Sequence, residues 1–588
     1  MNPASTNSLI ARGLCVDTEG HRRLDGVDLT LYPTSFLAVL GTSGAGKSTL
    51  LKALTGNDPA TSGTITLNDL DLYQSFEDVR TEIGYVPQED ILHPQLTVFE
   101  TLEFASRLRF PAATPEQDRL ARIHAVVAEL GLTDRVHARV DQLSGGQRKR
   151  VNVSLELLTE PSLLILDEPT SGLDPGNERL MMELLRDLAD RGRMVIVVTH
   201  SIESLHLCDN VLFLGRGGVP VYYGTPEAMP AHFGQSGFAE VFAHVESVGD
   251  LSMLRVTPAL SSLMPASAPL PRHRHTLFER AQRTDAGEVG RHFRILTERY
   301  LRVLSSDRRN MLILGLQAPI MAILMLAVFP TGKLDIPAVP QIDPKPEAGN
   351  ALMALVLAAV WLGASNAVRE VVKERPILRR EQNFGLSIAA YVGSKVVPLG
   401  VITFAQSLVL ALVGTARLGG LNDGLAGLPA LSLLTAMVAV CGLSALCLGL
   451  LLSAVVNSTD KAMTLLPVIL FAQFLLAGLI FPVSAIGIQQ LSWFATARWG
   501  FSGAASTADY WTLRGCANAT LKTSGNCAAL WQHHALAWAT SYTMLCVLGA
   551  AALFGAWRSI VRSDPAESLA RTARGSTQAA QERPTTIA

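Results

Sequence analysis

Hydrophobic and polar positions follow one pattern up to about residue 310 and another after it. In the first part, short apolar runs alternate with longer amphipathic stretches, and the clearest runs lie at residues 36–40, 163–166 and 194–198. This alternation predicts an α/β domain with buried strands. We expect that domain to cover residues 1–235.

Long stretches without charge dominate the second part. Six of them are long enough to cross a bilayer; they lie at residues 311–329, 351–368, 396–416, 425–456, 462–481 and 535–557. The fourth is too long for one span and too short for two, so we interpret it as one span with a lead-in around Pro429. The pattern predicts an all-α domain of six spans at 311–560, with an external segment at 482–534.

Three further segments connect or follow these domains. Residues 236–288, which include PASAPLPRHRH, are expected to be a linker. Residues 289–310 should form an interfacial connecting helix, although an ordinary surface helix is the alternative. Apolar side chains recur there at helical spacing, at Phe293, Leu296, Tyr300 and Val303. Residues 561–588 are expected to be a disordered cytosolic tail.

The distribution of basic residues predicts the orientation of the spans. Arginine and lysine gather before the first span, between the second and third, and after the sixth, and they are scarcer in the other loops. We therefore expect the first domain and both termini in the cytosol. The first residues also lack the basic stretch and apolar core of a secretory signal.

The composition agrees with a protein that is partly embedded in a membrane. Of the 588 residues 48% are hydrophobic and 17% charged, and the net charge is −2. Because there is no basic excess, we expect no nucleic acid partner. The seven cysteines include no CxxC pair. Cys516 and Cys527 lie in the expected external segment, where either a disulfide or two free thiols can exist.

The sequence GTSGAGKST at residues 41–49 follows an apolar run and precedes an apolar helical stretch, which is the context of a phosphate-binding loop. Its glycines let backbone N–H groups approach phosphate oxygens. Lys47 would neutralise the β and γ oxygens, and Ser48 would ligate Mg²⁺. We expect ATP to contact the whole segment, which is Gly41, Thr42, Ser43, Gly44, Ala45, Gly46, Lys47, Ser48 and Thr49.

Two adjacent carboxylates, Asp167 and Glu168, end the apolar run in LLILDEPTSGLD. Asp167 would hold Mg²⁺ partly through water, and Glu168 would polarise the attacking water as the general base. In isolation, such a pair is as often a solvated strand end. The phosphate loop earlier in the chain favours the catalytic interpretation.

The segment LSGGQRKR at residues 143–150 narrows the class of ATPase. Ser144, Gly145 and Gly146 would present hydroxyl and amide donors at a helix N-terminus, which suits a γ-phosphate. With Gln147 they complete LSGGQ, and the sequence here resembles the ATP-binding cassette family, whose signature is matched letter for letter. The resemblance implies an α/β nucleotide-binding domain of the P-loop type.

The same resemblance implies roles for three other residues. Gln88 in YVPQED resembles the glutamine that contacts Mg²⁺ and the membrane domain, and Asp174 in SGLD resembles the aspartate of the D-loop. His200 resembles the histidine that bonds the γ-phosphate, so Glu168, His200 and Gln88 are the expected catalytic group. Many family members stack an aromatic residue on adenine upstream of the phosphate loop, but here Val16 lies near that place.

The resemblance also implies a dimer. The family clamps ATP between the phosphate loop of one domain and the signature of another, and this chain holds one of each. A second copy of the chain is the expected partner, with a heterodimer as the lesser alternative. The order of the two domains is similar to that of bacterial G-type, or white-type, half-transporters.

The charged segment at residues 366–395 also resembles those half-transporters. We expect Glu370, Glu374 and Arg375 to contact the ATPase from the cytosolic surface, with a solvated loop as the alternative reading.

These observations predict ATP-driven export across a lipid bilayer, with ATP and Mg²⁺ bound. The spans hold few polar residues, mainly Gln317, Asn366, Gln406 and Gln473. That composition suits a lipid-like or amphipathic hydrophobic cargo, although the four residues are equally plausible as helix-packing groups. The alternative function is a membrane-embedded ATPase that signals across the membrane without transport. Frequent Ala and Arg suggest a bacterial host, hence the inner (cytoplasmic) membrane.

Overall fold

A computed structural model of the chain contains two compact units. It describes residues 7–18, 20–248, 251–256, 286–336, 345, 347–421, 424–480, 487–516 and 527–562. The first unit includes the chain up to Glu288 together with Arg379–Leu386, and the second includes Val289–Leu378 and Ser387–Ser563. Each unit has a hydrophobic core of its own. Nearly all of the expected tail lies outside the described residues.

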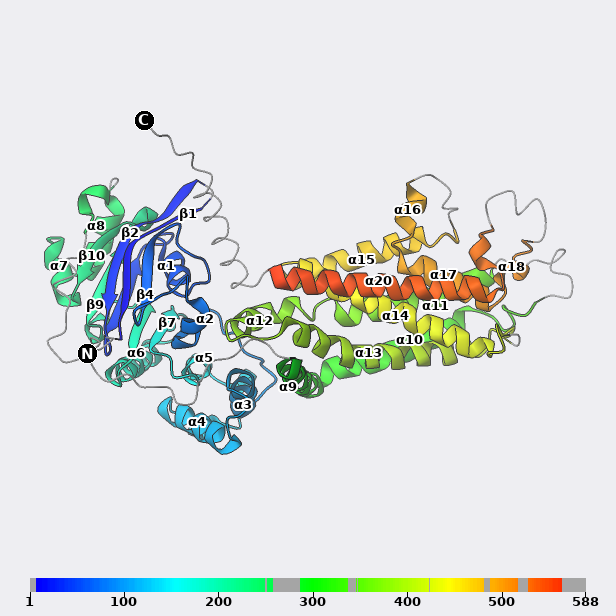
Figure 1. Cartoon of the computed structure of the whole chain (residues 1–588), viewed down its shortest axis with the longest axis horizontal. Coiled ribbons are helices and arrows are strands. Elements are labelled where there is room, and N and C mark those ends of the chain that lie inside the picture. Colours follow the sequence, from blue (N-terminus) through cyan, green and yellow to red (C-terminus); the bar gives the residue numbers. More distant parts are fainter. Residues whose placement is uncertain are drawn as a thin grey trace. The chain divides into compact units, whose positions relative to one another are not determined.

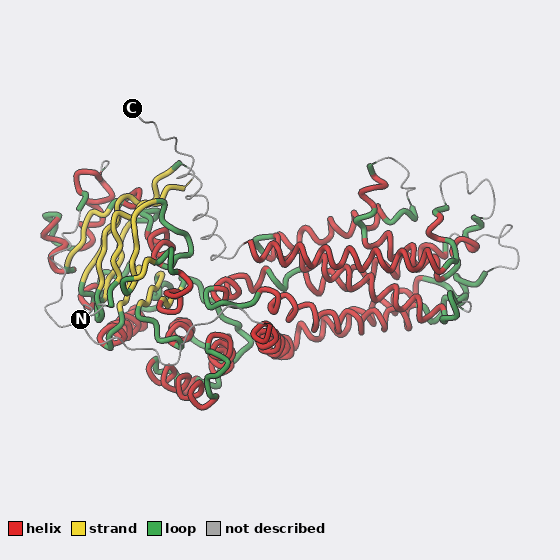
Figure 2. The backbone as a smooth tube through the Cα atoms, in the orientation of Figure 1, coloured by secondary structure: helices red, strands yellow, loops and turns green. Residues whose placement is uncertain are grey.

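A six-stranded sheet lies at the centre of the first unit, in the order β10-β9-β3-β8-β7-β6 (Figures 1 and 2). All neighbours are parallel except β10, which pairs antiparallel with β9. The strands are β3 (Phe36–Gly41), β6 (Ile83–Val86), β7 (Leu163–Asp167), β8 (Met194–Val198), β9 (Asn210–Leu214) and β10 (Pro220–Gly224). Strands β3, β7 and β8 are buried at every residue, as their continuous apolar sequences predict.

The two faces of this sheet are covered differently. One face packs against α1 (Lys47–Leu54) and a second, antiparallel sheet in the order β2-β1-β4-β5. Its strands are β1 (Leu9–Thr18), β2 (His21–Leu31), β4 (Ser62–Leu67) and β5 (Leu70–Asp71). The other face packs against helices, chiefly α3 (Val98–Arg109), α4 (Glu116–Glu129), α5 (Gly145–Leu157) and α6 (Pro175–Asp190). The unit also contains the short helices α2 (Phe76–Val79) and α7 (Met229–His232).

The first part of the expected linker is folded. Helix α8 (Phe238–Ser247) and the 3-10 turn Leu251–Leu254 follow residue 235. Val241, Val245 and Leu251 are buried in the core of the first unit. The expectation of a linker from residue 236 is therefore corrected, because these apolar side chains extend the domain. Residues 257–285 lie outside the described part of the chain.

The second unit contains six described helices that are long and apolar enough to cross a membrane, as expected. They are α10 (Arg308–Val328), α11 (Ala348–Ala367) continuing into α12 (Arg375–Gln382), α13 (Ile388–Gly414), α14 (Ala430–Val455), α15 (Thr459–Leu476) and α20 (Ala535–Arg562). The last residues of α12, from Arg379 on, belong to the first unit. Helix α14 begins directly after Pro429, so the long fourth run is a single span. The amphipathic helix α9 (Ala286–Ser306) precedes α10 and buries Leu296, Tyr300 and Val303.

The expected external segment forms short helices among its described residues. They are α16 (Ile488–Ser492), α17 (Thr496–Thr507), α18 (Tyr510–Leu513) and the 3-10 turn Ala529–Trp531. Helix α17 is almost entirely buried, and a Cβ added at Gly503 would overlap the side chain of Met437 on α14. A disulfide joins Cys516 to Cys527, which decides between the two states that the sequence left open.

Candidate ATP site

The predicted catalytic residues all follow strands that are neighbours in the sheet. Strands β3, β8, β7 and β6 run parallel, so their carboxyl ends share one edge, where ligands of open α/β sheets bind. The phosphate loop follows β3, and Glu168 follows β7 directly. His200 and Gln88 each lie two residues beyond the ends of β8 and β6. The topology thus brings together residues that are far apart in sequence.

The phosphate loop buries its lysine. Lys47 is 8% exposed, and its Nζ donates to the carbonyl oxygens of Gly41, at 2.6 Å, and Thr42, at 3.0 Å. Burial lowers the pKa of Lys47, against the opposing effect of the nearby carboxylates. Gly46 caps α1 with a φ of 89°, and a Cβ there would lie 2.4 Å from the carbonyl oxygen of Arg23, so only glycine fits.

Glu168 is the centre of a three-residue group. The amide nitrogen of Gln88 donates to its Oε2 at 2.9 Å, and Nε2 of His200 lies 3.2 Å from its Oε1. Glu168 has a φ of 47°, a left-handed conformation that is uncommon for a residue other than glycine. Its backbone N–H donates to the carbonyl oxygen of Val198 and so helps to hold this conformation. The expected catalytic group is therefore assembled within one chain.

The residues expected to bind Mg²⁺ offer the oxygen donors that this ion prefers. Asp167 is 9% exposed, and its pKa is raised by burial and by the adjacent Glu168, while Lys47 lowers it. A divalent cation would offset this repulsion between carboxylates. Together with Asp167, the hydroxyl of Ser48 and the amide oxygen of Gln88 fit such an ion. The Thr42 hydroxyl is buried without a hydrogen-bond partner among the described residues, which suits a loop that receives phosphate.

The signature residues lie elsewhere in the unit. Ser144 caps α5: its hydroxyl accepts from the Gln147 N–H at 3.3 Å, and Gln147 Oε1 accepts from the Ser144 N–H at 3.0 Å. A Cβ built at Gly146 would lie 3.4 Å from Asn177 at the start of α6. Figure 1 shows α5 apart from α1, which the phosphate loop precedes. The helix that carries the signature residues packs mainly against β6, α3, α4 and α6, whereas α1, which follows the phosphate loop, packs against β2, β3 and β7.

Asp174 caps a helix, and Val16 lies in the hydrophobic core. Asp174 caps α6 by accepting from the backbone N–H of Asn177 at 3.0 Å and from its side-chain amide at 2.6 Å, and these bonds lower the pKa of Asp174. Val16 is 5% exposed and belongs to the core between the sheets. Val16 therefore offers little exposed surface to an adenine ring in this conformation.

Comparison with known proteins agrees with this geometry. Residues 24–171 match the family model described as ABC transporter, and residues 291–508 match the model described as ABC-2 type transporter. The chain belongs to the ABC transporters. It is 38% identical to the ABC transporter ATP-binding/permease protein Rv1747 of Mycobacterium tuberculosis, over 92% of this chain and 61% of that protein.

Two plant relatives match a shorter part of the chain. ABC transporter G family members 26 and 28 of Arabidopsis thaliana are 38% and 42% identical over 37% and 35% of this chain, and over 32% and 19% of their own lengths. The chain thus spans less than two thirds of the length of these curated relatives. The ATPase-first order and these relatives are consistent with a bacterial G-type half-transporter.

The sequence did not indicate how the transporter connects Gln88 to the signature helix. Lys149 on α5 is 7% exposed, and its ammonium group donates to the carbonyl oxygen of Gln88. Asp90 accepts from Asn152 at 2.9 Å and from Arg148 at 3.3 Å. In the sequence, RKR resembles a solvated charge run. The burial of Lys149 follows only from the packing of α5 against this loop.

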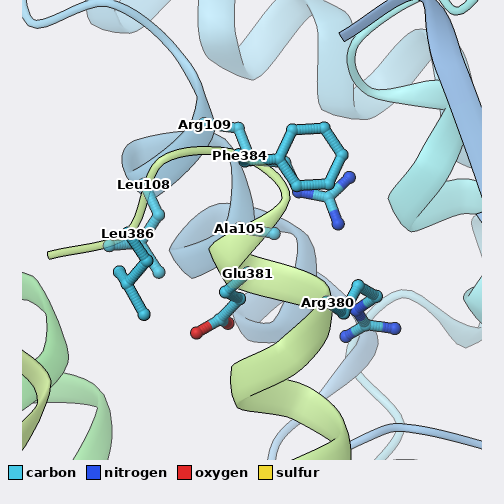
Figure 3. A pocket seen from close by; sticks show the side chains of 7 residues that line it. All are labelled: Ala105, Leu108, Arg109, Arg380, Glu381, Phe384 and Leu386. Carbon is cyan, nitrogen blue, oxygen red and sulfur yellow. The ribbon is translucent and has the colours of Figure 1, made fainter. Parts of the chain in front are cut away.

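A second set of contacts involves Arg379–Leu386, which belongs to the first unit although it follows the second span. The guanidinium of Arg109 lies 3.8 Å from the centre of the Phe384 ring. Its Nη2 lies 3.1 Å from Glu156 Oε1, and its Nη1 donates to the carbonyl oxygen of Leu155 at 2.6 Å. Figure 3 shows the small pocket around this contact, lined by Ala105, Leu108, Arg109, Arg380, Glu381, Phe384 and Leu386.

The three residues expected to contact the ATPase have partners inside the second unit. Glu374 pairs with Lys395 at 2.6 Å, and Glu370 pairs with Lys373 at 2.5 Å. The guanidinium of Arg375 donates to the side chain of Asn457 at 3.0 Å. Their contact with the ATPase stays a prediction, whereas Arg379–Leu386 supplies the contacts observed within the first unit.

The polar side chains of the spans bond to one another. Gln317 donates to Asn366 at 2.8 Å, and Asn366 donates to Gln406 at 2.7 Å and to Thr403 at 3.0 Å. Gln473 separately accepts from the backbone N–H of Ala497 at 3.0 Å. These bonds favour the helix-packing interpretation of the four polar residues over a substrate-binding one.

Proposed function

We propose that this ABC transporter is an ATP-driven exporter that works as a homodimer and moves a lipid-like or amphipathic hydrophobic molecule. The observation that carries the proposal is the division of the ATP site. Gln88, Glu168 and His200 assemble beside the phosphate loop, while Ser144 caps a separate helix. A second copy then supplies its signature residues to each bound nucleotide.

Hydrolysis follows from the arrangement of the chain's own groups. Backbone N–H groups of the phosphate loop and Lys47 bind the β and γ oxygens of ATP. Ser48, Asp167 and Gln88 would hold Mg²⁺, which would neutralise phosphate charge when bound. Glu168 accepts the proton of the attacking water, while Gln88 and His200 orient that carboxylate. Ser144 to Gly146 of the partner copy close on the γ-phosphate from the other side.

The membrane unit supports an apolar cargo. The candidate spans have mean hydropathies between 1.4 and 2.4, and their main polar side chains are hydrogen-bonded inside the unit. A sugar or ion would need polar groups free to replace its hydration. The distribution of basic residues supports an ATPase on the cytosolic side of the inner membrane. The Cys516–Cys527 disulfide supports an oxidising compartment on the non-cytosolic side of the membrane.

The test uses the full chain in lipid vesicles, with two probes: an NBD-labelled phosphatidylethanolamine and rhodamine 6G. The wild-type protein should move at least one probe when Mg-ATP is added, and the Glu168→Gln variant should bind ATP without moving either. General-base loss lowers rates by about 10²- to 10⁴-fold. Vigorous ATP hydrolysis with no movement of either probe would favour the signalling alternative.

A further inference from the structure

Helix α5 contacts both kinds of nucleotide-binding element. Its first turn carries the signature residues, which belong to the site that the partner copy completes. One turn further along, Lys149 donates to the carbonyl oxygen of Gln88, which belongs to this chain's own site. In the proposed dimer the same helix therefore carries residues that belong to two different nucleotide sites.

The contact between Lys149 and the Gln88 loop is buried and specific. The Lys149 side chain is 9% exposed, and its Nζ lies 3.6 Å from Asp90 Oδ1 as well as against the Gln88 carbonyl. Asn152, three residues along α5, donates to the same carboxylate at 2.9 Å. Two successive turns of the helix thus hold residues 88 and 90, so a displacement of α5 must move the loop.

The loop in turn sets the position of the catalytic carboxylate. The Gln88 side chain donates to Glu168 at 2.9 Å, and its backbone carbonyl is the group that Lys149 holds. The positive charge of Lys149 also acts on Asp167. A continuous series of bonds therefore runs from the signature helix through Gln88 to Glu168, the expected general base.

We propose that Lys149 is a positioning residue that couples the two ATP sites of the dimer. When the signature of one copy closes on the partner's nucleotide, α5 shifts, and Lys149 carries that shift to Gln88 and hence to Glu168 in its own site. Binding of ATP at one site then raises the affinity of the other site for ATP. This inference rests on the proposed homodimer.

The test measures the ATP dependence of hydrolysis by the full chain in lipid nanodiscs. Coupled sites typically change each other's affinity by about 5- to 150-fold and give Hill coefficients up to the number of sites. We expect cooperative hydrolysis by the wild-type protein and its loss in Lys149→Met. The matched control is Arg150→Met, which removes the same charge from the next position of α5 and should leave cooperativity unchanged.

Thermal unfolding and probe transport distinguish the outcomes. If Lys149→Met does not fold, Asp90→Asn, which removes the carboxylate charge beside Lys149, provides the second test and should also lower the Hill coefficient. Unchanged cooperativity in a folded Lys149→Met protein would overturn the inference. So would a wild-type protein that transports a probe but hydrolyses ATP without cooperativity, and that result would leave the proposed export standing.

Discussion

Arg109 and Glu156 form an ion pair in which each side chain is 3% exposed. Arg109 ends α3, and Glu156 lies in the last turn of α5. On its other side the Arg109 guanidinium stacks on Phe384. The signature helix is thus held at its far end to the segment that connects the second and third spans.

The ion pair should be sensitive to loss of one partner. Arg109→Leu leaves the Glu156 carboxylate buried without its partner, which costs about 3–5 kcal/mol in comparable sites. We expect a clear fall in the thermal unfolding midpoint of the purified protein. The double variant Arg109→Leu/Glu156→Leu removes both charges and should recover much of that loss. A double variant no more stable than the single one would contradict this account of the pair.

Phe384 should matter for coupling more than for hydrolysis. Phe384→Leu keeps an apolar side chain and leaves the Arg109–Glu156 pair in place, but it removes a stacking contact of about 0.5–2 kcal/mol. We expect basal ATP hydrolysis to continue while the number of rhodamine 6G molecules moved per ATP falls. The exposed Phe494 provides a control, because Phe494→Leu should not change that ratio. Equal ratios in the Phe384→Leu and wild-type proteins would exclude this role.

The raised pKa of Asp167 predicts a pH-dependent stability. The folded protein favours the protonated form of Asp167, so the protonated side chain stabilises the folded state relative to the ionised one. This stabilisation is fully present below the ordinary carboxyl pKa of about 3.9 and is lost as pH rises through the higher pKa of the folded state. At pH 7.5 the ionised carboxylate therefore destabilises the nucleotide-free protein. Asp167→Asn should raise its unfolding midpoint at pH 7.5, with a smaller gain at lower pH, and should abolish Mg-dependent hydrolysis. A lower midpoint at pH 7.5 would show that the carboxylate is stabilising instead.

The polar network of the spans should support packing. Asn366 makes hydrogen bonds to Gln317, Thr403 and Gln406. Bonds between membrane helices average about 0.6 kcal/mol, so Asn366→Leu should cost about 2 kcal/mol and lower the midpoint. Thr435→Val removes a hydroxyl that bonds within its own helix and should have little effect. A changed choice between the two transport probes, with no change in stability, would instead indicate a substrate contact.

The sequence predicts the site residues that lie in contiguous motifs, but it does not predict the residues whose role depends on tertiary packing. The phosphate loop, the acidic pair and the signature are contiguous segments of sequence, and the spans are recognised by their length and lack of charge. The order of motifs along the chain suggested that Gln88, Glu168 and His200 act together. The parallel order of the strands in the sheet is what brings the three residues to one edge. Neither Lys149 nor Arg109 was identified, because a charged side chain is usually solvated and its buried partner is distant in sequence. The one available signal was Glu156, because a carboxylate within an apolar helical run indicates a buried charge that needs a partner.

The central claim is that each nucleotide is bound between two chains, and differently tagged copies can test it directly. One heterodimer combines a Lys47→Ala chain with a Gly145→Asp chain, and the other combines a Lys47→Ala/Gly145→Asp chain with a wild-type chain. A Cβ at Gly145 meets only ordinary van der Waals contact at 3.5 Å, so aspartate fits while its charge repels phosphate.

ATP hydrolysis by these two purified heterodimers is the decisive measurement. If sites form across chains, the first heterodimer keeps one intact site and should hydrolyse ATP, whereas each site of the second carries one lesion and should be inactive. Activity in the second heterodimer and none in the first would show that each chain completes its own site, and would contradict the account.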